Sequence, residues 1–515
     1  MRQVGLRLGA LLCALGAITL GACSSDDASG DGGYDMPTGD SGSGNGPGSP
    51  SSSGTGPGSG AGGGGNPYIP DPDPVQAPPP EDAECAALDA SKPAVLYLSA
   101  DDSNSMASPI IARELIEQGF APNVPIRTYE FLNYYHLGYA PAPAGQLTIL
   151  PELAAREEAG VLDFQIGIRA FDAPAQRRPM TLTFVLDTSG SMQGAGLERE
   201  QAAIRAIAGN LAEGDIVNMT TWNTENLVVM SGHVATGPDD ADVLAAADLL
   251  TASGGTDLDG GLEAGYQLAK QHFGADRLNR VILISDGGAN VGETNGEVIG
   301  QSSQDADQEG IYLVGVHTGP AVGFADETLM NAVTDLGRGA YVYLDSPQEA
   351  ARVLGKRFDE VMDIAARGVQ VELTMPWYFQ IHEFYGEEFS ENPEEIEPQH
   401  LAPGDAMVLS QVLKACDASK IEGSDAVRIR ASWTEPLTYV PRETVIETTV
   451  QALLSAGTPH LPKAKAIVAY AEALKVGDPT KLQAALDLIA AADPDDSDPE
   501  LKEIKSLIAI HPAMQ

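Results

Sequence analysis

The feature that most constrains the fold of this chain is a central series of apolar, strand-length segments that alternate with helical ones. TLTFVLD (181–187) and RVILISDGG (280–288) are apolar runs that reach an aspartate, and IVNMTTWN, LVVMSGHV, IYLVGVHTG and GAYVYLDS also have strand character. The intervening GLEREQAAIRAIAGNLAEGD, ADVLAAADLLTA and LDGGLEAGYQLAKQHF have the spacing of amphipathic helices. Because several of these strands are almost wholly apolar, the pattern predicts a mostly parallel, doubly wound α/β sheet.

Three loops at one edge of this sheet carry oxygen atoms. Asp187, Ser189 and Ser191 follow the first strand, Thr256 precedes a helix, and Asp286 ends the strand VILIS. Ligands of doubly wound sheets bind outside the carboxyl ends of the strands, so we expect these side chains to lie together. Two carboxylates and three hydroxyls suit a hard cation, and we expect Mg²⁺, with Mn²⁺ or Ca²⁺ as alternatives.

These loops carry a family resemblance. FVLDTSGSM, SGGTDLDGGL and LISDGGANVG, in this order and spacing, resemble the von Willebrand factor type A (VWA) domain with its metal-ion-dependent adhesion site. The resemblance covers about 180–365. It implies that the three hydroxyl side chains bind the cation, that the two aspartates hold it directly or through water, and that the sixth position is left for an acidic group of a partner. A cation with few direct anionic ligands keeps enough positive character to attract that group.

The segments on either side of this region have the pattern of antiparallel strands. VQVELTM and VRIRASW alternate apolar and polar residues, and AVLYLSA and VLDFQIGIRAF also have strand character. Period-two alternation is typical of a sheet with one solvated face. We therefore expect a β-sandwich built from both flanks, 93–178 and 368–453, with the VWA domain inserted between them.

RTYEFLNYYHLGY (127–139) resembles the segment ahead of the VWA domain in a family of bacterial VWA lipoproteins that have a similar C-terminal extension. We expect its aromatic residues in a core rather than in a binding cage: Tyr129, Phe131, Tyr134, Tyr135 and Tyr139. The region 459–511 has two or three helical segments, interpreted as a helical cap on the sandwich rather than as a repeat unit.

The start of the chain has the composition of an export signal. MRQVGLRLGALLCALGAITLGAC has two arginines, a short apolar run and small residues before Cys23, and it resembles the lipobox of bacterial lipoproteins. This implies lipidation of Cys23 and a membrane anchor. By the sorting rule of such lipoproteins, Ser24 and Ser25 favour the outer membrane, on its periplasmic or surface face, over the inner one.

A segment rich in Gly, Ser, Pro and Asp follows, with no Lys or Arg between Arg7 and Lys92. It cannot bury enough apolar area to fold, so we expect a disordered tether with an r.m.s. span of roughly 40 Å. The expected organisation is a signal peptide (1–22), the tether (23–84), an N-terminal flank of helix and strands (85–179), the VWA domain (180–366), a β-rich domain (367–455) and a helical tail (456–515).

Four cysteines occur in the chain. Cys13 would leave with the signal and Cys23 would carry lipid, so Cys85 and Cys416 remain in an oxidising compartment. A disulfide between them and two unpaired thiols are equally open, because the sequence does not give their separation.

A second Asp-x-Ser-x-Ser sequence occurs in LSADDSNSMA (98–107). Asp101 has no threonine and aspartate of its own at the spacing that the fold requires, so we expect one metal site, at Asp187. The segment SPIIAREL after it reads as a helix that Ser103 or Ser105 would cap.

Charge and motifs limit the function. The net charge of −43 excludes a basic nucleic-acid surface and favours cations or cationic partners. The eight histidines are scattered, Ser189 and Ser191 lack the Gly-x-Ser-x-Gly context of a nucleophile, and His317 is expected to be structural. We therefore expect no enzyme, but an envelope protein that binds a protein or other macromolecule through the cation. An envelope scaffold in which the metal only stabilises the fold is the alternative; a metal-assisted hydrolase would need a general base that is not identifiable.

Overall fold

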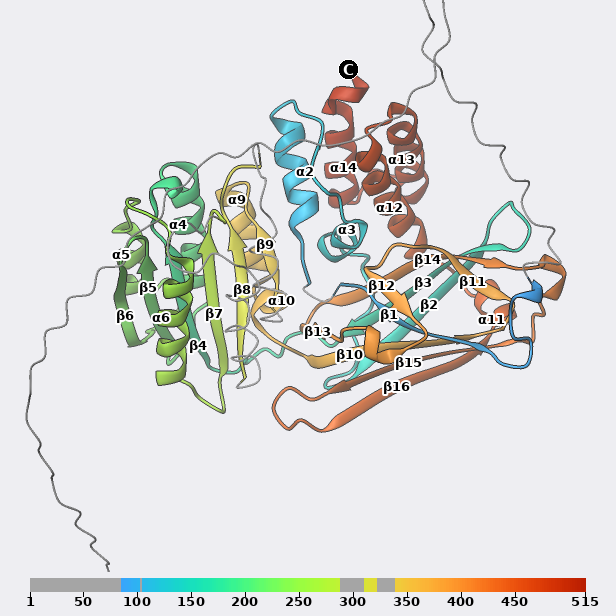
Figure 1. Cartoon of the computed structure of the whole chain (residues 1–515), viewed down its shortest axis with the longest axis horizontal. Coiled ribbons are helices and arrows are strands. Elements are labelled where there is room, and N and C mark those ends of the chain that lie inside the picture. Colours follow the sequence, from blue (N-terminus) through green and yellow to red (C-terminus); the bar gives the residue numbers. More distant parts are fainter. Residues whose placement is uncertain (1–84, 102–103, 288–309, 322–338) are drawn as a thin grey trace, which may run out of the picture. The chain divides into compact units, whose positions relative to one another are not determined.

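The computed structural model describes residues 85–101, 104–287, 310–321 and 339–515 (Figure 1). Its central sheet has the order β6-β5-β4-β7-β8-β9 among these residues. The strands are β4 (Met180–Asp187), β5 (Ile216–Trp222), β6 (Asn226–Val234), β7 (Leu278–Ser285), β8 (Ile311–His317) and β9 (Tyr341–Tyr343). All neighbours are parallel except β6, which is antiparallel to β5. Every residue of β4, β7 and β8 is buried, so the predicted mostly parallel, doubly wound sheet is confirmed.

The helices of this α/β unit lie against the sheet and against one another. They are α4 (Ala195–Ala208), α5 (Ala241–Asp248), α6 (Leu258–Gln271), α9 (Pro347–Ala350) and α10 (Phe358–Met362), with the short helical turns η1 (Gly190–Met192) and η2 (Ala351–Lys356). Helix α6 packs on β4, β5 and β7, whereas α4 packs with α5, α9 and η2. Gly265 makes the close approach of α6 possible, because a Cβ there would lie 2.2 Å from Cγ2 of Val185.

Two further sheets form the sandwich. One has the order β12-β1-β10-β15-β16, with β13 also paired to β10, and the other has the order β11-β14-β3-β2. The strands before the VWA domain are β1 (Ala94–Ser99), β2 (Leu147–Ala155) and β3 (Val161–Ala170). Those after it are β10 (Ala366–Met375), β11 (Phe379–Phe384), β12 (Glu388–Ser390), β13 (Gln399–Leu401), β14 (Ala406–Ala415), β15 (Ala426–Thr434) and β16 (Pro441–Thr449).

Strands from the two flanks pair directly with each other. Strand β1 is antiparallel to β10, with Leu96 opposite Leu373, and β3 is antiparallel to β14, with Ile166 opposite Leu409. One hydrophobic core contains residues of both sheets. The expected insertion of the VWA domain into a β-sandwich-like domain is therefore confirmed.

The alternating strands bury the residues that their pattern predicts. Along β10, Val369, Val371, Leu373 and Met375 are buried, and along β15 the buried residues are Val427, Ile429, Ala431 and Trp433. Cys416 lies in the same core and forms a disulfide with Cys85, with the Cα atoms 5.1 Å apart. Of the two alternatives that the sequence left open, the structure contains the pair.

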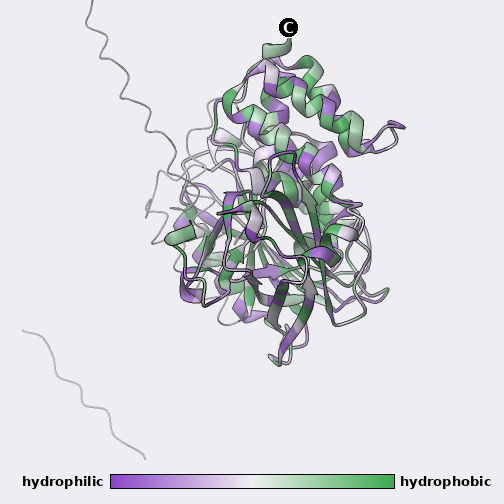
Figure 2. Cartoon of the chain, turned by 90° about the vertical axis from the view of Figure 1, so that its right-hand side faces the viewer, coloured by the Kyte–Doolittle hydropathy of each residue, from purple (hydrophilic) through white to green (hydrophobic). Residues whose placement is uncertain are grey.

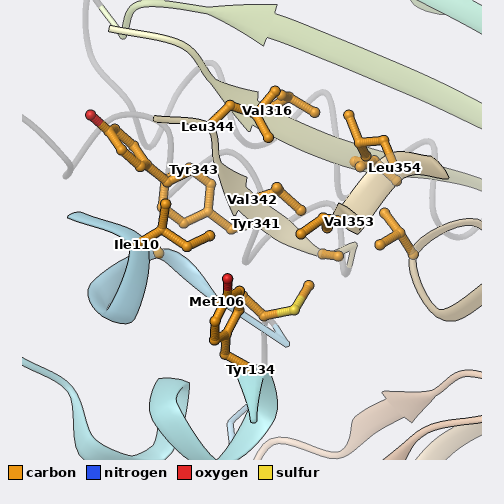
Figure 3. Packing of buried hydrophobic residues seen from close by; sticks show 14 of the residues in the cluster. Met106, Ile110, Tyr134, Val316, Tyr341, Val342, Tyr343, Leu344, Val353 and Leu354 are labelled. Atoms are coloured by element: carbon orange, nitrogen blue, oxygen red, sulfur yellow. The ribbon is translucent and has the colours of Figure 1, made fainter. Parts of the chain in front are cut away.

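Of the two helices in the N-terminal flank, α2 (Ala107–Glu117) packs on β9 of the VWA unit, and α3 (Thr128–Tyr134) packs on α2 and on β14 of the sandwich. Met106 donates its backbone N–H to the carbonyl of Tyr341 in β9 at 3.0 Å. In Figure 3, Met106, Ile110 and Tyr134 lie against the residues of β9. Phe131, Tyr134, Tyr135 and Tyr139 are buried in this core, and Tyr129 is half-buried, which agrees with the expectation for these aromatic residues.

The tail forms three helices, α12 (Leu461–Val476), α13 (Pro479–Ala492) and α14 (Pro499–Ile510), after the short α11 (Val450–Ser455). Their sequences mix hydrophobic and hydrophilic residues, as Figure 2 shows. We expected these helices to cap the sandwich alone. The structure shows that they also pack on the N-terminal flank, α12 on α3 and α14 on α2. The sandwich contacts include Lys465 Nζ with Asp163 Oδ2 at 2.5 Å. The sequence predicted helices in this region but not the elements on which they pack.

Arg113 of α2 connects the tail to the VWA unit. Its guanidinium lies 2.9 Å from Glu503 of α14, 2.8 Å from Glu349 and 2.6 Å from Asp345, and it donates to the hydroxyl of Tyr134. The arginine is nine-tenths buried, so these carboxylates replace the interactions with water that its guanidinium loses on burial. The tail, the N-terminal flank and the VWA unit therefore share one network of charges.

The expected signal peptide, Cys23 and the tether lie outside the described residues. None of the helices in the described part of the chain is long and apolar enough to cross a membrane.

Candidate metal centre

Asp187 ends β4 at the carboxyl edge of the central sheet and is fully buried. Its Oδ1 accepts a hydrogen bond from the backbone N–H of Ser189 at 2.9 Å, and its Oδ2 accepts one from the hydroxyl of Ser285 at 2.7 Å. Ser285 is the last residue of the neighbouring strand β7. The carboxylate is thus oriented by two elements.

Ser189 and Ser191 lie on the turn that follows β4. The helical turn η1 brings their hydroxyl oxygens to 2.9 Å from each other. Ser189 is fully buried, whereas Ser191 is exposed. The site therefore reaches solvent on the side of Ser191.

Thr256 lies in the loop before α6, and this loop runs beside the turn after β4. The backbone N–H of Gly190 donates to the carbonyl of Gly254 at 3.2 Å, and that of Ser253 donates to the carbonyl of Thr188 at 2.7 Å. Gly254 has φ +85°, and a Cβ there would lie 2.9 Å from Oγ1 of Thr224, so the position requires glycine. The loop that carries the buried Thr256 is thereby held beside the turn that carries the two serines.

Asp286 follows β7 directly and is half-buried. The loop after β8 packs against it, since a Cβ on Gly319 would lie 3.2 Å from Cβ of Asp286. The structure therefore places the residues expected from the sequence on adjacent loops at one edge of the sheet.

The electrostatics of this edge favour a cation. Burial, together with the charge of Asp286, outweighs the hydrogen bonds from Ser285 and Ser189 and raises the pKa of Asp187 to about 6. No lysine, arginine or histidine of the described residues forms a salt bridge with Asp187 or Asp286. Oxygen donors with two carboxylates that form no such ion pair fit a divalent ion such as Mg²⁺.

Two features at this edge were not predicted from the sequence. The hydroxyl of Ser285 orients Asp187. The feature of the sequence that could have revealed this role is the position of Ser285 at the end of a buried strand, next to Asp286. Glu200 of α4 is fully buried among apolar residues on the side of the helix that faces the sheet. The feature of the sequence that could have revealed it is a charged residue at a position that helical spacing places on the apolar face.

His317, expected to be structural, is buried at the end of β8 and stacks on Tyr343 with ring centroids 5.4 Å apart. Burial lowers the pKa of His317 to about 3, and the charge of Arg199 also lowers it. The histidine is therefore neutral at physiological pH, in agreement with a packing role.

A second group with ligand-type side chains lies at the other end of the sheet. His233 and Asp240 are 2.8 Å apart, and Asp242 is close to both. However, Asp240 is the N-cap of α5, and it accepts hydrogen bonds from Thr236, Asp242 and Val243. These bonds explain the arrangement as a helix cap without a metal.

Asp101 has a different environment from Asp187. It is buried, and its Oδ2 accepts hydrogen bonds from the backbone N–H of Ser105 and from Nδ2 of Asn133, both at 2.7 Å. The N-cap of α2 is Met106 rather than Ser105, although the hydroxyl oxygen of Ser105 accepts a long hydrogen bond, 3.5 Å, from the backbone N–H of Ala107 at the start of the helix. Ser103 lies outside the described residues.

Residues 182–289 match the family model of the von Willebrand factor type A domain. The chain therefore contains a VWA domain, and the central sheet with its three loops belongs to this domain.

Particular relatives share this region. The Escherichia coli (strain K12) protein YfbK is 27% identical over 292 residues, which cover 54% of this chain and 49% of YfbK. Inter-alpha-trypsin inhibitor heavy chain H2 of Mus musculus is 25% identical over 236 residues, which cover 44% of this chain and 24% of that protein. The chain thus spans half or less of these curated relatives. A solved von Willebrand factor type A structure from Catenulispora acidiphila has a TM-score of 0.43 and 13% identity, covering 71% of this chain and 96% of that one; this likeness is too weak to support a statement about function.

Proposed function

We propose that this chain is a lipid-anchored cell-envelope protein whose VWA domain binds an acidic group of another macromolecule through a divalent cation. The observation that carries the proposal is the pair of aspartates, Asp187 and Asp286, beside hydroxyls on a solvent-facing turn; neither aspartate forms a salt bridge within the described part of the chain.

The residues around the cation would have distinct roles. Ser189, Ser191 and Thr256 would supply neutral hydroxyl ligands, and the two aspartates would hold the ion directly or through water. Mg²⁺ prefers oxygen ligands in octahedral geometry and readily keeps an outer position for water or a partner group. Because Ser191 is exposed, a carboxylate from a partner would approach on that side.

VWA-domain proteins often mediate protein interactions, which agrees with a protein partner. The proposed membrane attachment rests on the sequence around Cys23 alone. We also propose that the protein is not an enzyme, since binding needs only the cation and an acidic ligand.

The proposal is tested by crosslinking on intact cells, with and without a chelator, in the wild type and in Thr256→Ala. Thr251→Ala, an exposed threonine of the same segment, is the matched control. We expect crosslinked adducts that are lost with the chelator and in Thr256→Ala, return when Mg²⁺ is restored to the wild type, and persist in Thr251→Ala. Adducts that survive both the chelator and Thr256→Ala would instead support a scaffold in which the metal only stabilises the fold.

A further inference from the structure

His136 lies where three parts of the chain meet. It follows α3 in the N-terminal flank, and its ring lies between a glutamate of the VWA unit and a glutamate of the tail. Its Nε2 is 3.2 Å from Oε2 of Glu360 in α10, and its Nδ1 is 3.4 Å from Oε1 of Glu500 in α14. Each ring nitrogen therefore faces a carboxylate of a different unit.

This arrangement determines which protonation state of the ring fits. A neutral imidazole carries a hydrogen on one nitrogen only, whereas a protonated imidazole carries one on both nitrogens. If the ring of His136 were neutral, one of its nitrogens would direct a lone pair at a carboxylate oxygen, and the two would repel each other. Both contacts are therefore favourable only when His136 is protonated.

The two glutamates also have partners whose charge does not depend on the histidine. Oε2 of Glu360 is 2.5 Å from Nε of Arg357, and Oε2 of Glu500 is 2.8 Å from Nζ of Lys463. Nη2 of Arg352 lies 4.0 Å from Oε1 of Glu500. Because arginine and lysine stay protonated at neutral pH, they favour the ionised form of both glutamates. The charge that changes at this junction near neutral pH is therefore that of the histidine.

The other charged side chains beside the ring are Asp405 and Arg169, which line with His136 a cavity of about 80 Å³. Burial tends to lower the pKa of His136, but the hydrogen bonds with the two glutamates outweigh burial and the charge of Arg357, and they raise the pKa above its usual value. The electrostatics of the junction thus agree with its geometry, because both favour the protonated ring.

We propose that His136 is a pH-sensitive link between the VWA unit and the tail: its protonated ring holds α10 to the first turn of α14, and loss of the proton as the pH rises releases this contact. The release is local, because Glu503 in the next turn of α14 is paired with Arg113 at 2.9 Å and with Arg352 at 2.8 Å. The tail would therefore loosen at the start of α14 and remain attached beyond it. The inference does not depend on a cation at Asp187.

The direction of the pH dependence follows from the raised pKa. A histidine whose pKa is higher in the folded state stabilises the fold fully below its unfolded value of about 6.5. This contribution is lost as the pH rises through the folded value. The link should therefore hold in mildly acidic solution and open in alkaline solution.

The first test measures the pKa of His136 in the full chain by NMR, with the signal assigned by its absence from His136→Gln. We expect a pKa above about 6.5 in the wild type, and a pKa lower by about one in Glu360→Gln and in Glu500→Gln. Asp359→Asn is the matched control, because it removes a charge of α10 that forms no ion pair with His136 in the described structure. It should change the pKa of His136 less than Glu360→Gln does.

The second test compares the wild type with His136→Gln at pH 6 and pH 9. The wild type should have the larger free energy of unfolding in urea at pH 6, and the difference should shrink towards zero at pH 9. Hydrogen exchange in the first turn of α14, corrected for the intrinsic rate, should quicken between these pH values in the wild type and be equally fast at both in His136→Gln. A wild-type pKa at or below 6.5, or a difference in unfolding free energy that is the same at both pH values, would overturn the proposal.

Discussion

Ser285 donates its hydroxyl hydrogen to Oδ2 of Asp187 at 2.7 Å, which links the ends of two adjacent parallel strands. The Ser285 oxygen in turn accepts a hydrogen bond from the backbone N–H of Gly287 at 3.0 Å. The residues before and after Asp286 therefore orient the carboxylate of Asp187. Such orientation lowers the cost of ordering the site when the ion binds.

Ser285→Ala should therefore weaken Mg²⁺ binding while the protein stays folded. A hydrogen bond to a charged group contributes about 1.5–3 kcal/mol, so we expect a loss of roughly tenfold to a hundredfold in affinity. Calorimetric titration checks this, with Ser253→Ala, an exposed serine of the Thr256 loop, as the control. An affinity for Ser285→Ala equal to that of the control would show that Asp187 needs no such orientation.

Asp101→Ala should affect stability but not metal binding. The change leaves the backbone N–H of Ser105 and the amide of Asn133 without their acceptor in a buried place. We expect a loss of about 2–3 kcal/mol in the free energy of unfolding, measured in urea. Unchanged stability would contradict the structural role assigned to Asp101.

Acid should weaken the attachment of the tail through Glu500. Burial tends to raise its pKa, but hydrogen bonds from His136 and Lys463 outweigh this and lower the pKa of Glu500 to about 2. Because the pKa is lower in the folded state, the ionised group stabilises the fold above its unfolded pKa. This contribution, up to about 3 kcal/mol, is lost as the pH falls from about 4.5 to 2.

The measurement is the difference in unfolding free energy between the wild type and Glu500→Gln as a function of pH. The difference should be largest near pH 7 and should shrink towards zero near pH 2. A difference that does not vary across this range would mean that the ion pairs of Glu500 do not stabilise the tail.

Cys23→Ala should release the protein from membranes, because the proposed anchor is the lipid on this residue. Fractionation of cells, with washed membranes probed for the protein, measures the change. The variant should appear in the soluble fraction, and its retention in washed membranes would refute the anchor.

The sequence predicted many of the strands because the burial of each strand is visible in its own pattern of apolar and polar residues. Continuous apolar runs identified β4, β7 and β8, and alternation identified β10 and β15. The three loop motifs also located the candidate site, since strand ends determine which loops meet. Patterns of this kind depend only on residues that are close together in the sequence, so they can be recognised without knowing the fold.

Long-range pairings were not predictable in the same way. Arg113 and Glu503 are separated by 390 positions, and no spacing rule connects them. For the same reason, the packing of α2 and α3 between the VWA unit and the tail was missed. Glu200 was missed because a glutamate at helical spacing is usually a solvated residue, and its burial depends on the sheet beneath it.

A calorimetric Mg²⁺ titration of the full chain tests most directly whether this VWA domain holds one divalent cation at Asp187. We predict one site in the wild type and in folded Asp101→Ala, and none in folded Asp187→Ala or Thr256→Ala. No binding by the wild type, two sites, or loss of the site in folded Asp101→Ala would contradict a single cation site at Asp187.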